Sequence, residues 1–203
     1  MNKTSNNFQL VKITRRYKAS FAEMVLVFAF AAIVGYFIET GYVFLVVGKI
    51  VKRGMLLGPY CPIYGFGALI LYYCFYDAKP TIKNIPSIFI IASLLLGSFE
   101  LLCGLGFKYI LGIEMWNYSG KFLNILNYTT VPILIGWGIL GTIYVFFLHP
   151  LIQKFVSLFP KKIMNKLAII IICIFLCDWL ISTKRINLDP QILTDLVNPQ
   201  NVT

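Results

Sequence analysis

Long apolar segments with very few charges constrain this chain more than any other feature. One of them runs from Ile88 to Phe107 and contains a single charged residue, Glu100. About 20 apolar residues cross the hydrocarbon core of a bilayer, and a carboxylate near the middle costs about 3 kcal/mol or more unless it is paired, protonated or hydrated. Glu39 repeats this pattern in the first apolar segment. The sequence therefore predicts acidic groups at membrane depth, and such groups indicate a functional site.

The composition and segment lengths predict an all-α, polytopic transmembrane helical bundle with about five spans. Of the 203 residues, 59% are hydrophobic, above the 45 to 50% of typical soluble domains. Barrel strands are excluded because the segments lack an alternating pattern, and open sheets because their edges would leave backbone groups unpaired in lipid. The five apolar segments are Met24–Val47, Cys61–Tyr76, Ile85–Gly112, Val131–Leu148 and Ile163–Ile181.

The chain divides into a basic arm (1–20), one transmembrane domain (21–182) and a polar tail (183–203). The first apolar run continues to Val47, beyond the length of a cleavable signal, so we expect an uncleaved first span. With five spans, the side that carries the arm has eleven Lys and Arg residues and the other side has seven. The positive-inside rule then predicts a cytoplasmic N-terminus.

The charge distribution and the absence of known motifs limit the kinds of partner and cofactor that the chain can be expected to bind. The net charge of +10 is spread over every loop, which favours contact with lipid headgroups and disfavours nucleic acid. Five cysteines without a C-x-x-C pair, and one histidine, predict no metal site, disulfide framework or cofactor. The sequence has no P-loop, G-x-S-x-G or H-E-x-x-H motif, so an ATP-driven function would need a separate ATPase chain.

The stretch from Arg53 to Gly67 holds two prolines and four glycines, yet it is apolar and leads directly into the short second segment. This pattern predicts a broken or re-entrant entry to the second span, because such backbone is tolerated at membrane depth only where protein or a cavity surrounds it. In transporters, exposed half-helix ends of this kind bind substrate or ions. The alternative is a tight interfacial loop with Tyr60 and Tyr64 in the aromatic belt.

Candidate site residues gather around the two glutamates. The Arg53 guanidinium is suited to pairing with Glu39 or Glu100, or to binding a phosphate, although an arginine at this position can also simply snorkel to the interface. Glycines near each carboxylate allow a neighbouring helix to approach closely. A purely structural role for the glutamates stays open. The predicted substrate-binding set is Glu39, Arg53, Tyr64, Glu100, Trp116, Asn117 and Tyr118.

Several of these motifs together resemble the bacterial family called putative ABC-transporter type IV, or CmpB-like permeases. The likeness covers about residues 24 to 152, and the run from Gly58 to Gly67 is its most specific part. The family pattern carries aspartate where this chain has Asn117, so a step that needs that aspartate would be missing here. The segments that carry the resemblance are Gly35–Glu39, Gly58–Gly67, Glu100, Trp116–Ser119, Gly136–Gly138 and His149–Pro150.

The resemblance implies a permease-like component of a transport system in a bacterial cytoplasmic membrane, with an unspecified substrate and a separate ATPase subunit. The stretch from Gln153 to Lys166 is the predicted docking region for that subunit. Two other functions stay open: a membrane-embedded enzyme acting on lipid or polyprenyl-phosphate headgroups, with Arg53 holding phosphate and a glutamate as acid or base, and an accessory or immunity-type membrane subunit. Self-association into a homo-oligomer is also left open.

Overall fold

The computed structural model describes residues 19–52 and 54–189, and most of these residues are helical. The strands are two residues each and form one antiparallel hairpin, in which Asn124 pairs with Thr130 and Ile125 with Thr129. The predicted all-α fold is confirmed. The elements are α1 (Phe21–Val47), α2 (Pro62–Phe75), the 3-10 turn η1 (Ile82–Asn84), α3 (Ile85–Leu111), β1 (Asn124–Ile125), β2 (Thr129–Thr130), α4 (Val131–Ile143), the π-helical turn η2 (Tyr144–Leu148), α5 (His149–Ser157) and α6 (Lys161–Leu188).

Four stretches of helix are long and apolar enough to cross a membrane: Phe21–Val47, Ile82–Ile110, Val131–Ser157 and Lys161–Leu188. They correspond to the first, third, fourth and fifth predicted segments. The second segment forms α2, whose 14 residues extend only about 21 Å against a hydrocarbon core of about 30 Å. The last helix ends at Leu188, several residues into the predicted polar tail.

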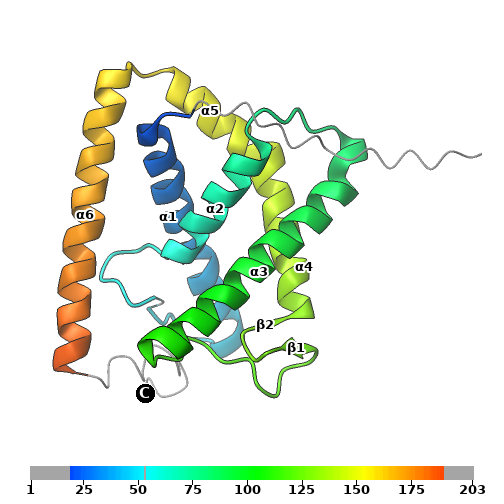
Figure 1. The fold of residues 1–203 in the computed structure, drawn as a ribbon, viewed down its shortest axis with the longest axis vertical. Coiled ribbons are helices and arrows are strands. Elements are labelled where there is room, and N and C mark those ends of the chain that lie inside the picture. Colours follow the sequence, from blue (N-terminus) through cyan, green and yellow to red (C-terminus); the bar gives the residue numbers. More distant parts are fainter. Residues whose placement is uncertain (1–18, 53, 190–203) are drawn as a thin grey trace, which may run out of the picture.

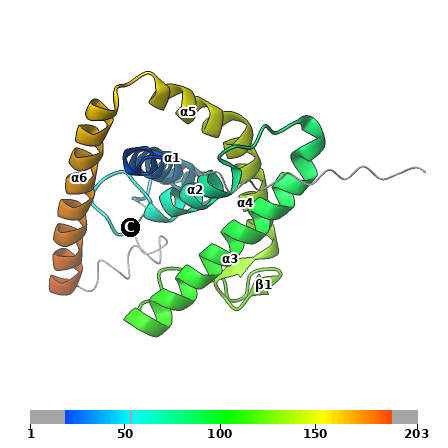
Figure 2. The same cartoon turned by 45° about the horizontal axis from the view of Figure 1, so that its top comes forward.

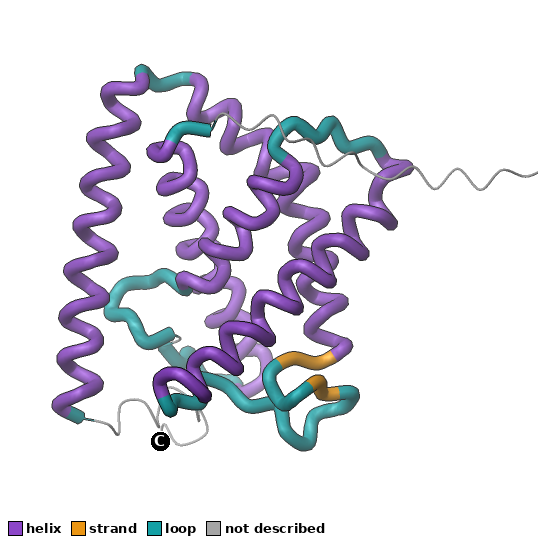
Figure 3. Tube along the Cα trace, in the orientation of Figure 1, coloured by secondary structure: helices purple, strands orange, loops and turns teal. Residues whose placement is uncertain are grey.

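The second crossing is completed by irregular backbone, as the prolines and glycines predict. The chain leaves α1 at Gly48, and the described residues between there and Cys61 have no regular structure. The Cys61 backbone N–H donates to the Ala32 carbonyl of α1 at 2.8 Å. Ala32 lies near the middle of α1, so the segment 48–61 turns back into the bundle before α2 begins (Figures 1 and 3). This segment is called the re-entrant segment below.

The helices form a bundle with two distinct ends. Helix α1 packs against α2 and α6, and α3 packs against α4. The start of α1, the α2–α3 connection and α5 lie at one end, called the α5 end. The hairpin and the end of α6 lie at the other, called the hairpin end (Figure 1). Helix α6 stands at one edge, well away from α3 and α4 in both views (Figures 1 and 2).

The bend into α5 follows from Pro150. Proline lacks a backbone N–H, and its ring clashes with the carbonyl four residues earlier, so a continuous α-helix cannot pass through it unchanged. The wider π-helical turn Tyr144–Leu148 lies directly before the bend. His149, the first residue of α5, is only 3% exposed.

Asp178 of α6 fixes the re-entrant segment in place. One carboxylate oxygen accepts hydrogen bonds from the Leu57 backbone N–H (2.8 Å) and the Ser182 hydroxyl (2.7 Å). The other accepts from the Gly58 backbone N–H (2.7 Å) and from the Tyr60 hydroxyl. Backbone donors in lipid must be satisfied inside the protein, and Asp178 satisfies two of them from a helix about 120 residues further along the chain.

We expect Asp178→Ala to lower the thermal unfolding temperature and the membrane abundance of the protein. The substitution leaves the Gly58 amide without its acceptor and the Leu57 amide with only its longer bond, 3.2 Å, to the Ser182 hydroxyl. Each unsatisfied buried donor costs about 1 to 3 kcal/mol. Asp178→Asn keeps one carbonyl oxygen and should lose less. Cys177→Ala, at an exposed neighbouring position, is the control. Unfolding temperatures equal to wild type for both Asp178 variants, measured in one detergent, would refute this role.

Candidate functional site

Glu100 is the centre of the polar network at the hairpin end. The side chain is 5% exposed, in the second half of α3. Its Oε2 accepts hydrogen bonds from the Thr129 hydroxyl at 2.8 Å and the Trp137 indole N–H at 3.1 Å. Its Oε1 accepts a longer one, 3.5 Å, from the Tyr118 hydroxyl. The donors come from the α3–α4 connection and from α4, so this carboxylate joins both to α3.

Glycines on the same face of α3 allow that approach. A Cβ at Gly97 would overlap the Leu134 side chain of α4, and a Cβ at Gly104 would lie 2.6 Å from the Tyr128 ring. Both residues are on the face that carries Glu100, at three- and four-residue spacings. The prediction that glycines beside this carboxylate permit close packing is therefore confirmed.

The connection 112–130 folds over the Glu100 carboxylate. The Trp116 indole N–H donates to the Tyr128 carbonyl at 2.9 Å, and the Tyr118 backbone N–H donates to the Asn127 carbonyl at 2.7 Å. These bonds hold the two sides of the connection together and place Tyr118 and Thr129 at Glu100. Trp116 thus acts as a positioning residue for the groups that touch the carboxylate.

Asn117 makes its hydrogen bonds on the exposed side of this connection. Its carbonyl accepts from the Ser119 backbone N–H at 2.7 Å, and its amide donates to Glu114 at 3.2 Å. Glu114 also forms an ion pair with Lys108 at 2.9 Å, and that contact, with the Asn117 and Tyr128 hydrogen bonds, holds the pKa of the Glu114 carboxyl below its ordinary value. An aspartate at position 117 would keep the Ser119 bond but place a second negative charge beside Glu114.

Glu39 lies at the start of α2. The Cys61 thiol donates to Glu39 Oε2 at 3.2 Å, and Cys61 is the residue that caps the N-terminus of α2. The positive end of a helix dipole stabilises a negative charge in that position. The broken second crossing therefore presents its half-helix end to a carboxylate of α1.

Tyr64 connects the two glutamate regions. Its ring lies against Gly35 of α1, where a Cβ would overlap it, and its centroid is 5.2 Å from that of Trp137. Trp137 in turn donates to Glu100. One series of side-chain contacts thus joins α1, α2, α3 and α4. Its members in order are Glu39, Cys61, Tyr64, Trp137 and Glu100.

The structure brings together four of the seven predicted site residues: Glu39, Tyr64, Glu100 and Tyr118. Trp116 supports them from the connection, and Asn117 faces its exposed side. Arg53 lies outside the described residues, so its pairing with a glutamate or a phosphate stays a prediction. In the part of the chain that the structure describes, no group of three or more His, Cys, Asp or Glu side chains is arranged to hold a metal ion.

Sequence reasoning missed Thr129, Trp137 and Asp178. In the sequence, Trp137 lies between two glycines, and Asp178 lies near the end of the fifth apolar segment. A signal for Asp178 did exist, because Ser182 is four residues later on the same helix face. Asp178 is an acidic residue inside an apolar run, the same pattern that singled out Glu100.

A second polar cluster lies at the α5 end. Glu23 caps the start of α1 through Ser20 and accepts a hydrogen bond from the Tyr72 hydroxyl at 2.9 Å. The Tyr76 carbonyl meets His149 Nε2 at 3.1 Å and accepts from the Gln153 amide at 2.9 Å. These contacts tie α1, α2 and α5 together. The His149 ring packs against the Tyr72 ring, with 5.0 Å between centroids and 55° between the ring planes, which fits a packing role for the histidine.

The family model described as "Putative ABC-transporter type IV" matches residues 26–183, from α1 into α6. The chain belongs to this family. The resemblance seen in the sequence is confirmed, and the match continues beyond residue 152 to include Asp178 and Ser182. Four membrane-length apolar helices agree with a membrane protein of this ABC-transporter-type family. No curated protein and no solved structure matches the chain.

Proposed function

We propose that this chain is the permease component of an ABC-type transport system in a bacterial cytoplasmic membrane, driven by a separate ATPase chain. Family membership supports the transport class, and the sequence has no P-loop of its own. The excess of Lys and Arg on the side of the basic arm supports a cytoplasmic α5 end. The substrate is left unspecified.

The substrate pathway in this proposal passes the Glu100 network. The observation that carries it is a buried carboxylate in a membrane-length helix, held by donors from two other elements beside a broken helix. Intramembrane carboxylates are costly, and discontinuous helices in transporters present their half-helix ends to substrates or ions. Glu39 at the start of α2 and Glu100 behind Trp137 would then be the polar groups that a solute meets, with Tyr64 and Tyr118 beside them. Arg53 completes the proposed set.

The ATPase would dock on residues 153–166 at the α5 end. This stretch includes the second half of α5, the turn to α6 and the first residues of α6. Lys154, Lys161 and Lys162 are exposed along it, together with Phe155 and Leu158. Apolar side chains surrounded by lysines suit a partner surface that is apolar with an acidic rim.

The docking proposal predicts that a tagged chain, expressed at native level and extracted in mild detergent, co-purifies with a stoichiometric P-loop ATPase. The double charge reversal Lys161→Glu with Lys162→Glu should lower ATPase recovery at least fivefold, because it repels an acidic rim. The matched control is Lys49→Glu with Lys52→Glu at the opposite end of the bundle, which should leave recovery unchanged. Quantitative mass spectrometry measures the ratio of the two chains.

Absence of any ATPase in several mild detergents would contradict the transport assignment. Turnover of a lipid-linked phosphate by the purified chain alone would replace it with the enzyme alternative. Equal ATPase recovery from both charge-reversal variants would contradict the docking surface alone and leave the permease assignment standing.

For the site itself, we expect Glu100→Gln to keep normal membrane levels and to lose complementation of a strain that lacks the chain. Glutamine has the shape of glutamate and keeps a carbonyl acceptor for Thr129 and Trp137, but it carries no charge. Glu114→Gln, on the exposed connection, is the matched control and should complement. Full complementation by Glu100→Gln, or a loss of function that only follows a loss of abundance, would contradict the site assignment.

A further inference from the structure

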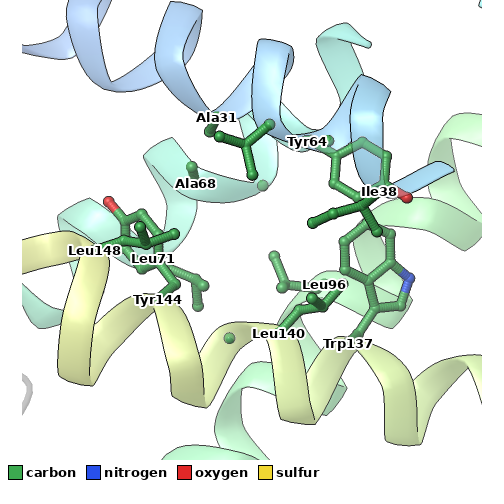
Figure 4. A pocket seen from close by; sticks show the side chains of 14 residues that line it. Ala31, Ile38, Tyr64, Ala68, Leu71, Leu96, Trp137, Leu140, Tyr144 and Leu148 are labelled. Carbon is green, nitrogen blue, oxygen red and sulfur yellow. The ribbon is translucent and has the colours of Figure 1, made fainter. Parts of the chain in front are cut away.

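A cavity of about 70 Å³ lies between α1, α2 and α4, separate from the carboxylate contacts. Its walls are apolar and include short side chains. Tyr64 and Trp137 form one end, and Tyr144 and Leu148 form the other, nearest α5 (Figure 4). The side chains along its length include Ala31, Ile38, Ala68, Leu71, Leu96 and Leu140.

The cavity exists because the helices around it pair with other neighbours. Helix α1 packs on α2 and α6, while α4 packs on α3, which leaves the space between α1 and α4 to short side chains such as Ala31 and Ala68. An unfilled apolar cavity destabilises a core, and apolar cavities accept apolar ligands. An engineered cavity of about 150 Å³ holds benzene, so this one has room for a few methylene groups of a longer chain.

The position of the cavity along the helices indicates what fills it. Its lining runs from Trp137 to Leu148, within a stretch of helix long and apolar enough to cross a bilayer, and opposite the central turns of α1. Seven residues separate Trp137 from Tyr144, which is a rise of about 10 Å. Lipid hydrocarbon surrounds such helices at that depth.

The end of the cavity near α5 has an unsatisfied polar group. Tyr144 is 5% exposed, and its hydroxyl has no hydrogen-bond partner among the described residues. Tyr144 lies in the π-helical turn directly before α5, and its ring is 6.0 Å from that of His149, which belongs to the polar contacts of the α5 end. A hydroxyl at that level is placed to donate to the ester carbonyls of a phospholipid, which lie at the edge of the hydrocarbon core.

Exposed lysines lie on the surface of the α5 end. The α2–α3 connection contributes Lys79 and Lys83, and the α5–α6 region contributes Lys154, Lys161 and Lys162. Both regions are at the α5 end of the bundle (Figure 1). Lysines at a membrane edge attract anionic headgroups.

We propose that this cavity binds part of one acyl chain of an anionic phospholipid, with its ester group at Tyr144 and its headgroup among the lysines of the α5 end. The acyl-chain site does not require the transport proposal, because it uses neither Glu100 nor an ATPase. Its headgroup would share Lys154, Lys161 and Lys162 with the proposed docking surface. The aromatic faces of Tyr64 and Trp137 close the far end of the chain site. The bound lipid would thereby contact the residues that connect the two glutamate regions.

The test uses phosphatidylglycerol with a diazirine in the middle of one acyl chain, photolysed with the purified chain in phosphatidylcholine nanodiscs. Peptide mass spectrometry should find adducts on cavity residues such as Tyr64 and Leu140. Excess unlabelled phosphatidylglycerol should remove at least four fifths of them, and the matching phosphatidylcholine probe should give at least threefold fewer. Adducts confined to lipid-facing residues such as Ile139, or not removed by competitor, would overturn the proposal. Equal labelling by the two headgroups would overturn its anionic part.

Substitutions in and beside the cavity make the test specific. Leu140→Trp fills the cavity and should reduce cavity adducts at least fivefold, whereas Ile139→Trp, at a neighbouring position that is 50% exposed, should leave them unchanged. Ala31→Phe fills the same space from α1 and replaces Leu140→Trp if that variant does not fold. Tyr144→Phe should raise the concentration for half-maximal labelling about two- to tenfold, the range expected for one lost hydrogen bond. Unchanged cavity labelling in the filled variants would refute the site.

Discussion

Polar groups placed at membrane depth must find their partners within the protein, and this constraint shapes the whole hairpin end of the bundle. Asp178 accepts the backbone donors of Leu57 and Gly58, and the Ala32 carbonyl accepts the donor of Cys61. Glu100 accepts donors from the α3–α4 connection and α4. Each irregular segment is thus held by a carboxylate or carbonyl of a long helix, and each buried carboxylate is satisfied by donors from elsewhere in the fold.

The two ends of the molecule therefore differ in their polar contacts. At the hairpin end, irregular backbone and acidic side chains stabilise each other, and the half-helix α2 begins beside Glu39. At the α5 end, the polar contacts are made by Glu23, Tyr72 and His149, and basic side chains surround them. A polar pathway from one end and a lipid-facing cavity toward the other would meet at Tyr64 and Trp137, whose rings are 5.2 Å apart.

Local sequence signals were enough to predict the helical bundle and the broken second crossing, and to single out Glu100 as an acidic residue in an apolar helix. Prolines and glycines act on their own backbone, and a charge in an apolar run is visible without any partner. The partners themselves are set by packing between distant segments, so nothing in the sequence linked Asp178 to Leu57 or Trp137 to Glu100. Trp116 and Asn117 were grouped with Tyr118 because they are adjacent, yet the fold points them to different partners.

Hydrogen–deuterium exchange of the protein in lipid nanodiscs tests most directly whether the re-entrant segment is built into the bundle. The amides of Leu57, Gly58 and Cys61 are hydrogen-bonded to Asp178 and Ala32, so peptides covering residues 55–61 should exchange at least a hundredfold more slowly than an open chain. Asp178→Ala should remove that protection while α3 stays protected. Exchange across residues 55–61 at the rate of an open loop in the wild-type protein would contradict the account.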